Sequence, residues 1–408
     1  MSNDIQPEIR FPGFTEDWEQ RKLSEGTSKI GDGLHGTPNY SDNGDVFFIN
    51  GNNLVNGKIV ITKETKLVTE SNQSKDDKLL NRDTILMSIN GTIGNLAWYN
   101  NERVMLGKSA AYLTVSNFDK KFIFSYLQTS TIKNYFLNNL TGTTIKNLGL
   151  KTIRDTTLFV PTLEEQQKIG SLFKQLDDTI ALHQRKLDLL KETKKGFLQK
   201  MFPKNGAKVP EIRFPGFTGD WEQRKLGQVA NYRRGSFPQP YGNKEWYDGE
   251  NSMPFVQVVD VGDNLRLVED TKQKISELAQ PKSVFVEEGK VVVTLQGSIG
   301  RVAITQYPAY VDRTLLIFES YKAEMDEYYF AYVIQQLFEY EKTRAPGGTI
   351  KTITKEALSN FTISFPSIAE QKKLGKFFEQ LDDTIALHQR KLDLLKETKK
   401  GFLQKMFV

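Results

Sequence analysis

Two segments of this chain occur twice, and this internal repeat constrains the fold more than any other feature of the sequence. Residues 8–23 read EIRFPGFTEDWEQRKL, and residues 211–226 repeat that string with a single substitution. Residues 176–202 read LDDTIALHQRKLDLLKETKKGFLQKMF, and residues 381–407 repeat that string without a change. The segments between the repeats differ widely, so the chain is a tandem pair of one frame around two different inserts.

The second repeated segment predicts a long amphipathic helix in each copy, over residues 163–202 and 367–408. Its seam positions alternate at spacings of four and three, which is the 3.5-residue period of a coiled coil. These positions are Ile169, Phe173, Leu176, Ile180, His183, Leu187, Leu190, Lys194, Phe197 and Met201, and in the second copy Leu374, Phe378, Leu381, Ile385, His388, Leu392, Leu395, Lys399, Phe402 and Met406.

Both predicted helices begin with the same signal. Thr162 and Ser367 each lie three residues before a glutamate, Glu165 and Glu370, which is the pattern of a capping box. Pro203 ends the first helix.

Two identical seams in one chain are expected to pack on each other. The connection between them holds a whole domain, so the spacing alone leaves a parallel and an antiparallel pair open. An antiparallel pair has a pseudo-twofold axis and brings His183 close to His388 at the crossing. We interpret both as polar residues of a packed seam, because His35 is the one further histidine and no cysteine is present to complete a metal site.

The inserts consist of short strand-like runs broken by Gly, Asn and Pro, each followed by a helix-like stretch. Strands are expected at Asp45–Ile49, Lys58–Thr62, Thr84–Ser88, Ala111–Val115, Phe255–Val259, Lys290–Leu295 and Leu315–Glu319, and helices at Lys121–Leu140 and Glu324–Glu341. Each insert is therefore interpreted as an α+β domain. The predicted organisation is a domain over 1–162, a spacer helix over 163–202, a linker over 203–210, a domain over 211–366 and a spacer helix over 367–408.

Composition narrows the class of protein. Hydrophobic residues make up 38% and charged residues 26% of the 408, which is ordinary for a globular chain. No apolar run reaches the roughly 18 residues of a membrane span, and the N-terminus lacks the features of a signal peptide. The absence of cysteine fits a cytoplasmic protein. The net charge of +5 comes from the helical segments, so the inserts together are neutral.

Two motifs resemble catalytic or nucleotide-binding sequences without their context. Residues 31–36 match G-x-G-x-x-G, but no clear strand precedes them and Pro38 blocks the helix that should follow. Gly107-Lys108-Ser109 resembles the end of a P-loop, but position 102 is glutamate where that loop has its first glycine. With no Ser/His/Asp set either, the sequence favours a binding function over catalysis.

The tandem organisation, the Glu165-Gln166 and Glu370-Gln371 pairs at the helix starts, and the segment 31–38 resemble the specificity subunit of type I restriction–modification systems. The resemblance covers essentially the whole chain. It implies two α+β target-recognition domains, separated by two long antiparallel coiled-coil helices in a pseudo-twofold tandem repeat. It further implies a non-catalytic protein in which each domain reads one half of a bipartite, asymmetric site in double-stranded DNA and the helices set the spacer.

The same resemblance implies the partners. Two methyltransferase (M) subunits bind the specificity subunit, restriction (R) subunits then join, and no membrane is involved. S-adenosylmethionine, ATP and Mg²⁺ are expected in those partner subunits, and no cofactor is expected in this chain. The alternative function is a coiled-coil scaffold for proteins alone, with the inserts as two peptide-binding modules.

The comparison between the inserts sorts the candidate DNA contacts, because shared features should serve fold or phosphate contact and differing features should carry readout. Readout candidates are His35, Thr37, Asn39, Tyr40, Asn50, Asn52 and Asn53 in the first insert, and Arg233, Arg234, Gln239, Tyr241, Lys244 and Gln257 in the second. Asn90 and Gln296, in the matching loops 88–94 and 294–300, fit either class, and Lys146 and Lys351 are candidates for phosphate contact. The alternative for the readout candidates is a solvated loop residue, and for the shared loops it is turn chemistry.

The repeated helices are the candidate docking surface for the M subunits, because their exposed positions are identical as well as their seams. Arg185 and Lys186, with their counterparts Arg390 and Lys391, are the proposed partner-binding residues. Recent duplication or gene conversion is the alternative explanation for that identity.

Overall fold

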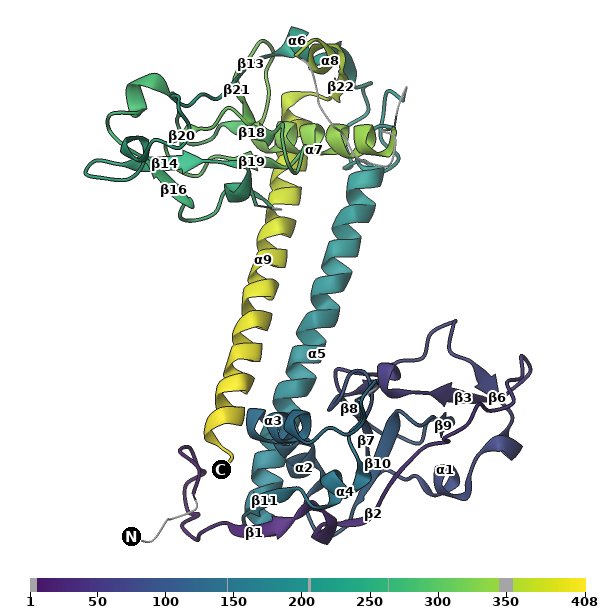
Figure 1. Ribbon diagram of the computed structural model, residues 1–408. Coiled ribbons are helices and arrows are strands. Elements are labelled where there is room, and N and C mark those ends of the chain that lie inside the picture. Colours follow the sequence, from purple (N-terminus) through teal and green to yellow (C-terminus); the bar gives the residue numbers. More distant parts are fainter. Residues whose placement is uncertain (1–5, 145, 205–206, 263, 345–354) are drawn as a thin grey trace. The chain divides into compact units, whose positions relative to one another are not determined.

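The computed structural model describes residues 6–144, 146–204, 207–262, 264–344 and 355–408. The chain divides into two compact units, one of Met1–Gln184 with Lys391–Val408 and the other of Arg185–Arg390. The long helices α5 (Leu163–Lys200, teal in Figure 1) and α9 (Ile368–Lys405, yellow) each contribute residues to both units. Each unit thus combines one insert with the start of one long helix and the end of the other.

The first unit is built around two sheets of three or more strands that pack face to face. The larger has the order β2-β10-β7-β8 (Thr27–Asp32, Ala110–Val115, Thr84–Ser88, Leu96–Trp98) and is antiparallel throughout, and the smaller has the order β6-β3-β9 (Leu67–Val68, Val46–Ile49, Val104–Leu106) with β3 parallel to β9. Side chains alternate along β7. Ile85 and Met87 face the core that contains the helices, and Leu86 faces the core between the sheets.

Short helices cover the other face of the larger sheet in the first unit. They are α2 (Lys120–Tyr126), α3 (Ser130–Asn138) and α4 (Leu150–Arg154), with α1 (Lys75–Leu79) at the smaller sheet. The single helix expected over Lys121–Leu140 is therefore wrong. Thr129 interrupts it, because its hydroxyl accepts a hydrogen bond from the backbone N–H of Ile132 and caps a new helix there.

The second unit repeats this architecture. Its larger sheet has the order β13-β21-β18-β19-β15 (Ala230–Arg234, Leu315–Tyr321, Val291–Thr294, Val302–Ile304, Leu265–Arg266), and its smaller sheet the order β16-β14-β20-β17 (Gln273–Ile275, Met253–Val256, Ala309–Val311, Val284–Val286). Helices α6 (Leu226–Val229), α7 (Glu327–Arg344) and α8 (Lys355–Asn360) complete it. Val291 and Val293 belong to the core cluster that contains α7, and Val292 belongs to the cluster shared with the smaller sheet.

Most predicted strands are confirmed, and three local expectations need correction. The strand expected over Lys58–Thr62 is limited to β5 (Lys58–Ile59), which pairs with β4 (Leu54–Val55). The strand expected to reach Val259 ends at Val256 and continues as a 3-10 turn. A strand, β2, does precede residues 33–36, although no helix follows over residues 33–45.

The repeated segment near the start of each copy fastens its domain to a long helix. Its end forms β1 (Glu19–Lys22) or β12 (Glu222–Lys225), which pairs with the strand before the helix, β11 (Thr157–Val160) or β22 (Thr362–Phe365). Arg10 contacts both carboxylate oxygens of Glu165 at 2.7 and 2.8 Å. Arg213 binds Glu370 in the same way at 2.6 and 2.7 Å.

These ion pairs correct the predicted capping box. The hydroxyl of Thr162 accepts a hydrogen bond from the backbone N–H of Glu165 at 3.4 Å, as a cap does. The carboxylate of Glu165 instead receives the guanidinium of Arg10, because it is fully buried and a charge is the partner that offsets its loss of solvent.

The glutamine that follows each of these glutamates joins the helix to the domain. Gln166 accepts a hydrogen bond from the backbone N–H of Asp119 at 3.0 Å and donates one to the carbonyl of Pro161 at 2.9 Å. In the second unit Gln371 makes the same contacts with Asp326, at 3.1 Å, and with Pro366, at 2.9 Å.

Within each unit the ends of the two long helices run antiparallel, as predicted. In the first unit Phe407 packs on Phe173, with ring centroids 5.5 Å apart, while Lys399 pairs with Asp177 one turn further along α5. The second unit shows the same order in its pairs Phe197–Phe377 and Lys194–Asp382. His183 and His388 belong to different units, so their proximity stays a prediction.

Candidate functional site

The strand β3 in the first unit and β14 in the second each lead into a 3-10 turn, Gly51–Asn53 and Val258–Asp260. Asn50 and Gln257 occupy the same position, immediately after the strand. Each turn is closed by the residue three positions later. Asn53 accepts a hydrogen bond from the N–H of Asn50 at 2.9 Å, and Asp260 accepts one from the N–H of Gln257 at 2.8 Å. The side chains of Asn53 and Asp260 therefore shape the turns.

A second turn, residues 107–109, lies against the first in the first unit. The hydroxyl of Ser109 donates to Oδ1 of Asn50 at 3.0 Å and accepts from the N–H of Gly51 at 2.9 Å. A Cβ atom on Gly107 would lie 2.3 Å from Oδ1 of Asn50, so this close approach requires glycine. The contact leaves Lys108 exposed at the tip of the turn.

The second unit has Asp312, Arg313 and Thr314 at the matching turn. Asp312 is 1% exposed, and its carboxylate accepts hydrogen bonds from the N–H of Thr314 at 2.9 Å and from the hydroxyls of Thr314 and Tyr241. Gln257 donates to the hydroxyl of Tyr241 at 3.4 Å. Two of the predicted readout residues, Tyr241 and Gln257, are thus brought together.

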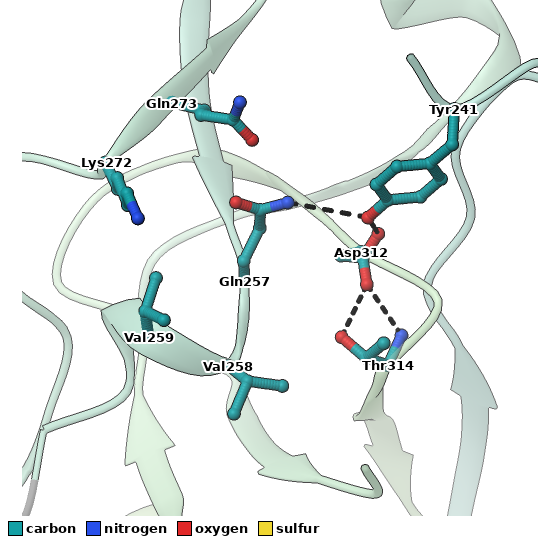
Figure 2. Close-up of a pocket in the computed structure, with 8 residues that line it drawn as sticks. All are labelled: Tyr241, Gln257, Val258, Val259, Lys272, Gln273, Asp312 and Thr314. Atoms are coloured by element: carbon teal, nitrogen blue, oxygen red, sulfur yellow. Dashed lines mark hydrogen bonds between the residues drawn. The ribbon is translucent and has the colours of Figure 1, made fainter. Parts of the chain in front are cut away.

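These residues border a pocket of about 300 Å³ in the second unit (Figure 2). Its lining consists of Tyr241, Gln257, Val258, Val259, Lys272, Gln273, Asp312 and Thr314. Burial, and the hydrogen bond to Asp312, raise the pKa of Tyr241 above its ordinary value. Tyr241 therefore remains a protonated donor at neutral pH, and the pocket offers polar groups beside the exposed apolar side chain of Val259.

The loops 88–94 and 294–300 border the same turns, and their shared residues serve the fold. Ser88 donates to the carbonyl of Asn90 at 3.0 Å, and Thr294 donates to that of Ser298. The backbone of Asn90 bridges to Asn147, which places the loop that carries exposed Lys146 beside it. Gln296 is exposed in the matching loop.

The remaining predicted DNA-contact residues are exposed wherever the structure describes them. His35 Nε2 lies 2.7 Å from Asp32, at the end of β2. Thr37, Asn39, Tyr40, Asn52, Gln239 and Lys244 are exposed, and Lys351 lies outside the described residues. Arg233 and Arg234 are exposed on β13, where Arg233 lies 3.8 Å from Glu319.

Lys108 and Arg313 are candidate contacts that the sequence patterns did not single out. Each is the exposed basic residue at the tip of a turn that follows matched strands, β9 and β20. The signal was present in the sequence, since aligning the strands of the two copies places these two basic residues opposite each other. Lys108 instead stood out only as part of an incomplete P-loop.

The long helices carry exposed residues of two kinds. Arg185, Lys186, Arg390 and Lys391 are exposed, as a docking surface requires. Leucines at matched positions of the repeat are also exposed, by 58% and 67% for Leu182 and Leu189, and by 63% and 62% for Leu387 and Leu394. The spacing of seven residues places each pair of leucines about two turns apart on one face of its helix.

None of the helices in the described part of the chain combines the length and apolar character that crossing a bilayer would require.

Comparisons with known proteins agree with one another. A family model described as "Type I restriction modification DNA specificity domain" matches residues 15–192 and again residues 218–397. Over 292 residues the chain is 24% identical to the putative type I restriction enzyme MjaX specificity subunit of Methanocaldococcus jannaschii, a match that spans 70% of this chain and 64% of that protein. It is 21% identical over 415 residues to the MjaIX specificity subunit of the same organism, spanning 96% and 93% of the two chains.

A solved structure is similar in fold. The crystal structure of the type I restriction–modification system S subunit from M. genitalium superimposes with a TM-score of 0.67, at 15% sequence identity, over 99% of both chains.

Proposed function

This chain belongs to the family of type I restriction–modification DNA specificity domains and contains two such domains, and from that premise we propose that it is the DNA-reading, non-catalytic subunit of a type I restriction–modification system. Each α+β domain reads one half of a bipartite, asymmetric site in double-stranded DNA. The helices α5 and α9 set the spacer between the halves. Methylation and ATP-dependent cleavage belong to the partner subunits.

The observation that carries this proposal is the pair of matched turns after β3 and β14. Both units hold the turn after β3 or β14 with a hydrogen bond from a backbone N–H to the side chain three residues later, yet the side chains that the turn presents differ. Asn50 and Lys108 in the first unit stand where Gln257 and Arg313 stand in the second. Amide side chains suit adenine and guanidinium groups suit guanine, so one scaffold with two sets of side chains is suited to two different half-sites.

Exchange of one domain tests whether each domain recognises its own half-site independently of the other. Sequencing of methylated bases in cells that carry this chain with its partner subunits should give one split motif with a fixed spacer. Replacing residues 24–160 with the insert of another family member should alter one half of that motif and leave the other half and the spacer intact. A change in both halves contradicts modular readout.

Salt dependence separates this function from a scaffold that binds peptides alone. The assembled complex should bind duplex DNA with an affinity that falls steeply as salt rises, because phosphate contacts release counterions. A complex with no measurable affinity for duplex DNA at low salt favours the scaffold.

We further propose that α5 and α9 each dock one methyltransferase subunit, through Arg185 and Lys186 on one helix and Arg390 and Lys391 on the other. The exposed leucines next to them, Leu189 on α5 among them, support this surface because solvent alone does not favour large apolar side chains there. The two helix surfaces are identical in sequence, which suits two copies of one partner.

Charge reversal tests the docking surface. R185E with K186E should leave one methyltransferase subunit bound per chain, as measured by mass in solution, and R390E with K391E should do the same. Two bound subunits with unchanged affinity in both variants would exclude these surfaces.

A further inference from the structure

Arg313 is held in place more firmly than an ordinary exposed arginine. It lies at the tip of the turn between β20 and β21, and its Cζ atom lies 5.3 Å from the centre of the Tyr241 ring. A guanidinium stacks on an aromatic face because the ring's negative face attracts the cation. This contact restricts the movement of the guanidinium, while the side chain stays exposed and its N–H donors remain accessible.

The ring beneath Arg313 is itself anchored. The hydroxyl of Tyr241 donates to the buried carboxylate of Asp312, and Gln257 donates to the same hydroxyl (Figure 2). The ring of Tyr241 also packs against Phe237, with ring centroids 5.0 Å apart. A hydroxyl fixed at one end and a ring packed at the other leave Tyr241 little freedom to turn.

Asp312 is the fixed point of this arrangement. Its carboxylate is held by the backbone N–H and the hydroxyl of Thr314, two residues along the same turn. Because Asp312 and Arg313 are neighbours in sequence, the anchor of the ring and the stacked cation belong to one rigid turn. A pre-organised side chain loses less conformational entropy when it binds.

We propose that Arg313 reads one guanine in the half-site bound by the second unit, with Tyr241 and Asp312 as its positioning residues. The chemistry that fits is the major-groove edge of guanine, whose O6 and N7 accept two parallel N–H donors from one guanidinium. This role rests on the proposed function, since it names one base contact of the domain that reads DNA. A guanidinium can also hold a phosphate through two N–H donors, but such a contact carries no sequence information and would strengthen binding to every duplex alike.

The matched turn of the first unit shows what this arrangement adds. There Lys108 takes the place of Arg313, and the turn is tied to Asn50 through Ser109. A lysine ammonium is a point charge with freely rotating donors, so it lacks the planar fork. At this turn the second unit presents a restrained guanidinium, whereas the first unit presents an ammonium group.

The experiment uses the complete complex with its methyltransferase subunits. The methylated motif of the wild type is determined first, and duplexes with each single-base change in the half-site read by the second unit are then assayed for binding. In R313A, discrimination against the changed base should decrease by a factor of about five to 100 at one G·C position. Discrimination at the other positions should stay unchanged. R313K retains the positive charge but should lose the same discrimination. R224A, on the strand β12, is the matched control for the removal of an exposed arginine.

The positioning residues have their own readout. Y241F keeps the ring and removes the hydroxyl, so it should weaken discrimination at the same G·C position as R313A and at no other. D312N should affect that position too. A loss of discrimination spread evenly over the half-site in Y241F would contradict a positioning role.

Several results overturn the proposed role of Arg313. Unchanged base preference in R313A does so, as does full discrimination in R313K. An equal loss of affinity for all duplexes in R313A, with a salt slope lowered by about one, identifies a phosphate contact instead. A wild-type complex that methylates no defined sequence refutes the proposed function itself, whereas a defined motif whose second-unit half lacks a G·C pair refutes only the role of Arg313.

Discussion

Lys399, near the end of α9, lies with its Nζ 2.6 Å from the carboxylate of Asp177 in the first half of α5. The matched residues Lys194 and Asp382 form the same pair in the second unit, at 2.5 Å. All four side chains are no more than a quarter exposed. Each unit is therefore closed by a lysine that comes from the other copy of the repeat.

Removing the lysine should destabilise its unit. In K399M the carboxylate of Asp177 loses its cation while it remains largely shielded from water. We therefore expect the free energy of unfolding to decrease by about 1–3 kcal/mol. K400M, at the next and exposed position, should change it by less than about 0.5 kcal/mol. Chemical denaturation checks both variants, and an equal effect of the two would contradict a role for the pair.

The bidentate pair between Arg10 and Glu165 should matter more. R10A leaves a fully buried carboxylate without a partner, which typically costs about 3–5 kcal/mol. R21A removes an arginine of the same repeated segment that is 48% exposed and pairs with Glu19, so its effect should stay below about 0.5 kcal/mol. Thermal unfolding of the two variants tests this, and R10A with a wild-type midpoint would refute it.

Replacing each of the four glycines of the long helices by alanine should raise the free energy of unfolding at two positions and lower it at the other two. Gly196 and Gly401 have open space where a Cβ atom would lie, so alanine should stabilise each helix by about 0.5–1 kcal/mol. A Cβ on Gly170 would lie 2.6 Å from the backbone nitrogen of Phe122, and one on Gly375 would lie 2.4 Å from Asp326.

G170A and G375A should therefore lower the free energy of unfolding by about 1–3 kcal/mol, because the helix that abuts each glycine must move. Calorimetry on the four single variants measures the sign. Stabilisation by all four would show that the domains yield at these contacts without cost.

Asp326 provides a test by pH. Its carboxylate accepts a hydrogen bond from the N–H of Tyr329 at 2.9 Å at the start of α7, and burial raises its pKa above the ordinary value. The folded chain thus holds this proton more tightly than the unfolded chain. The contribution of Asp326 to stability is present below the unfolded pKa of about 4 and is lost as pH rises through the higher folded pKa.

D326N keeps an acceptor for the cap but does not ionise. Its stability relative to the wild type should therefore increase as pH rises from about 4 to 7. Thermal midpoints of both proteins across this range check the sign. A difference that shrinks with rising pH would show that the ionised carboxylate is favoured in the folded chain.

Local pattern was enough to predict the long helices. The seam period and the proline and capping signals place them at 163–202 and 367–408, and the structure has α5 at Leu163–Lys200 and α9 at Ile368–Lys405. A helix seam depends on side chains a few positions apart, so the sequence contains the whole signal. The same holds for Thr84–Ser88, whose run of apolar residues forms β7.

The contacts between distant parts of the chain could not be predicted in this way. The ends of the two helices are identical in sequence, so nothing in Phe407 or Phe202 says which domain it completes. The tertiary structure decides this, because Phe407 packs on Trp18 and Phe202 on Trp221.

For the candidate site, the sequence by itself determined which positions differ between the two copies, and so selected Asn50, Tyr241 and Gln257. It did not determine that Asp312 anchors Tyr241 beneath Arg313. A polar side chain chooses its partner from whatever the fold brings within hydrogen-bond distance, and these residues meet through the pairing of β14 with β20. Periodicity is a local property of the sequence, whereas the partner of a buried carboxylate is a property of the folded chain alone.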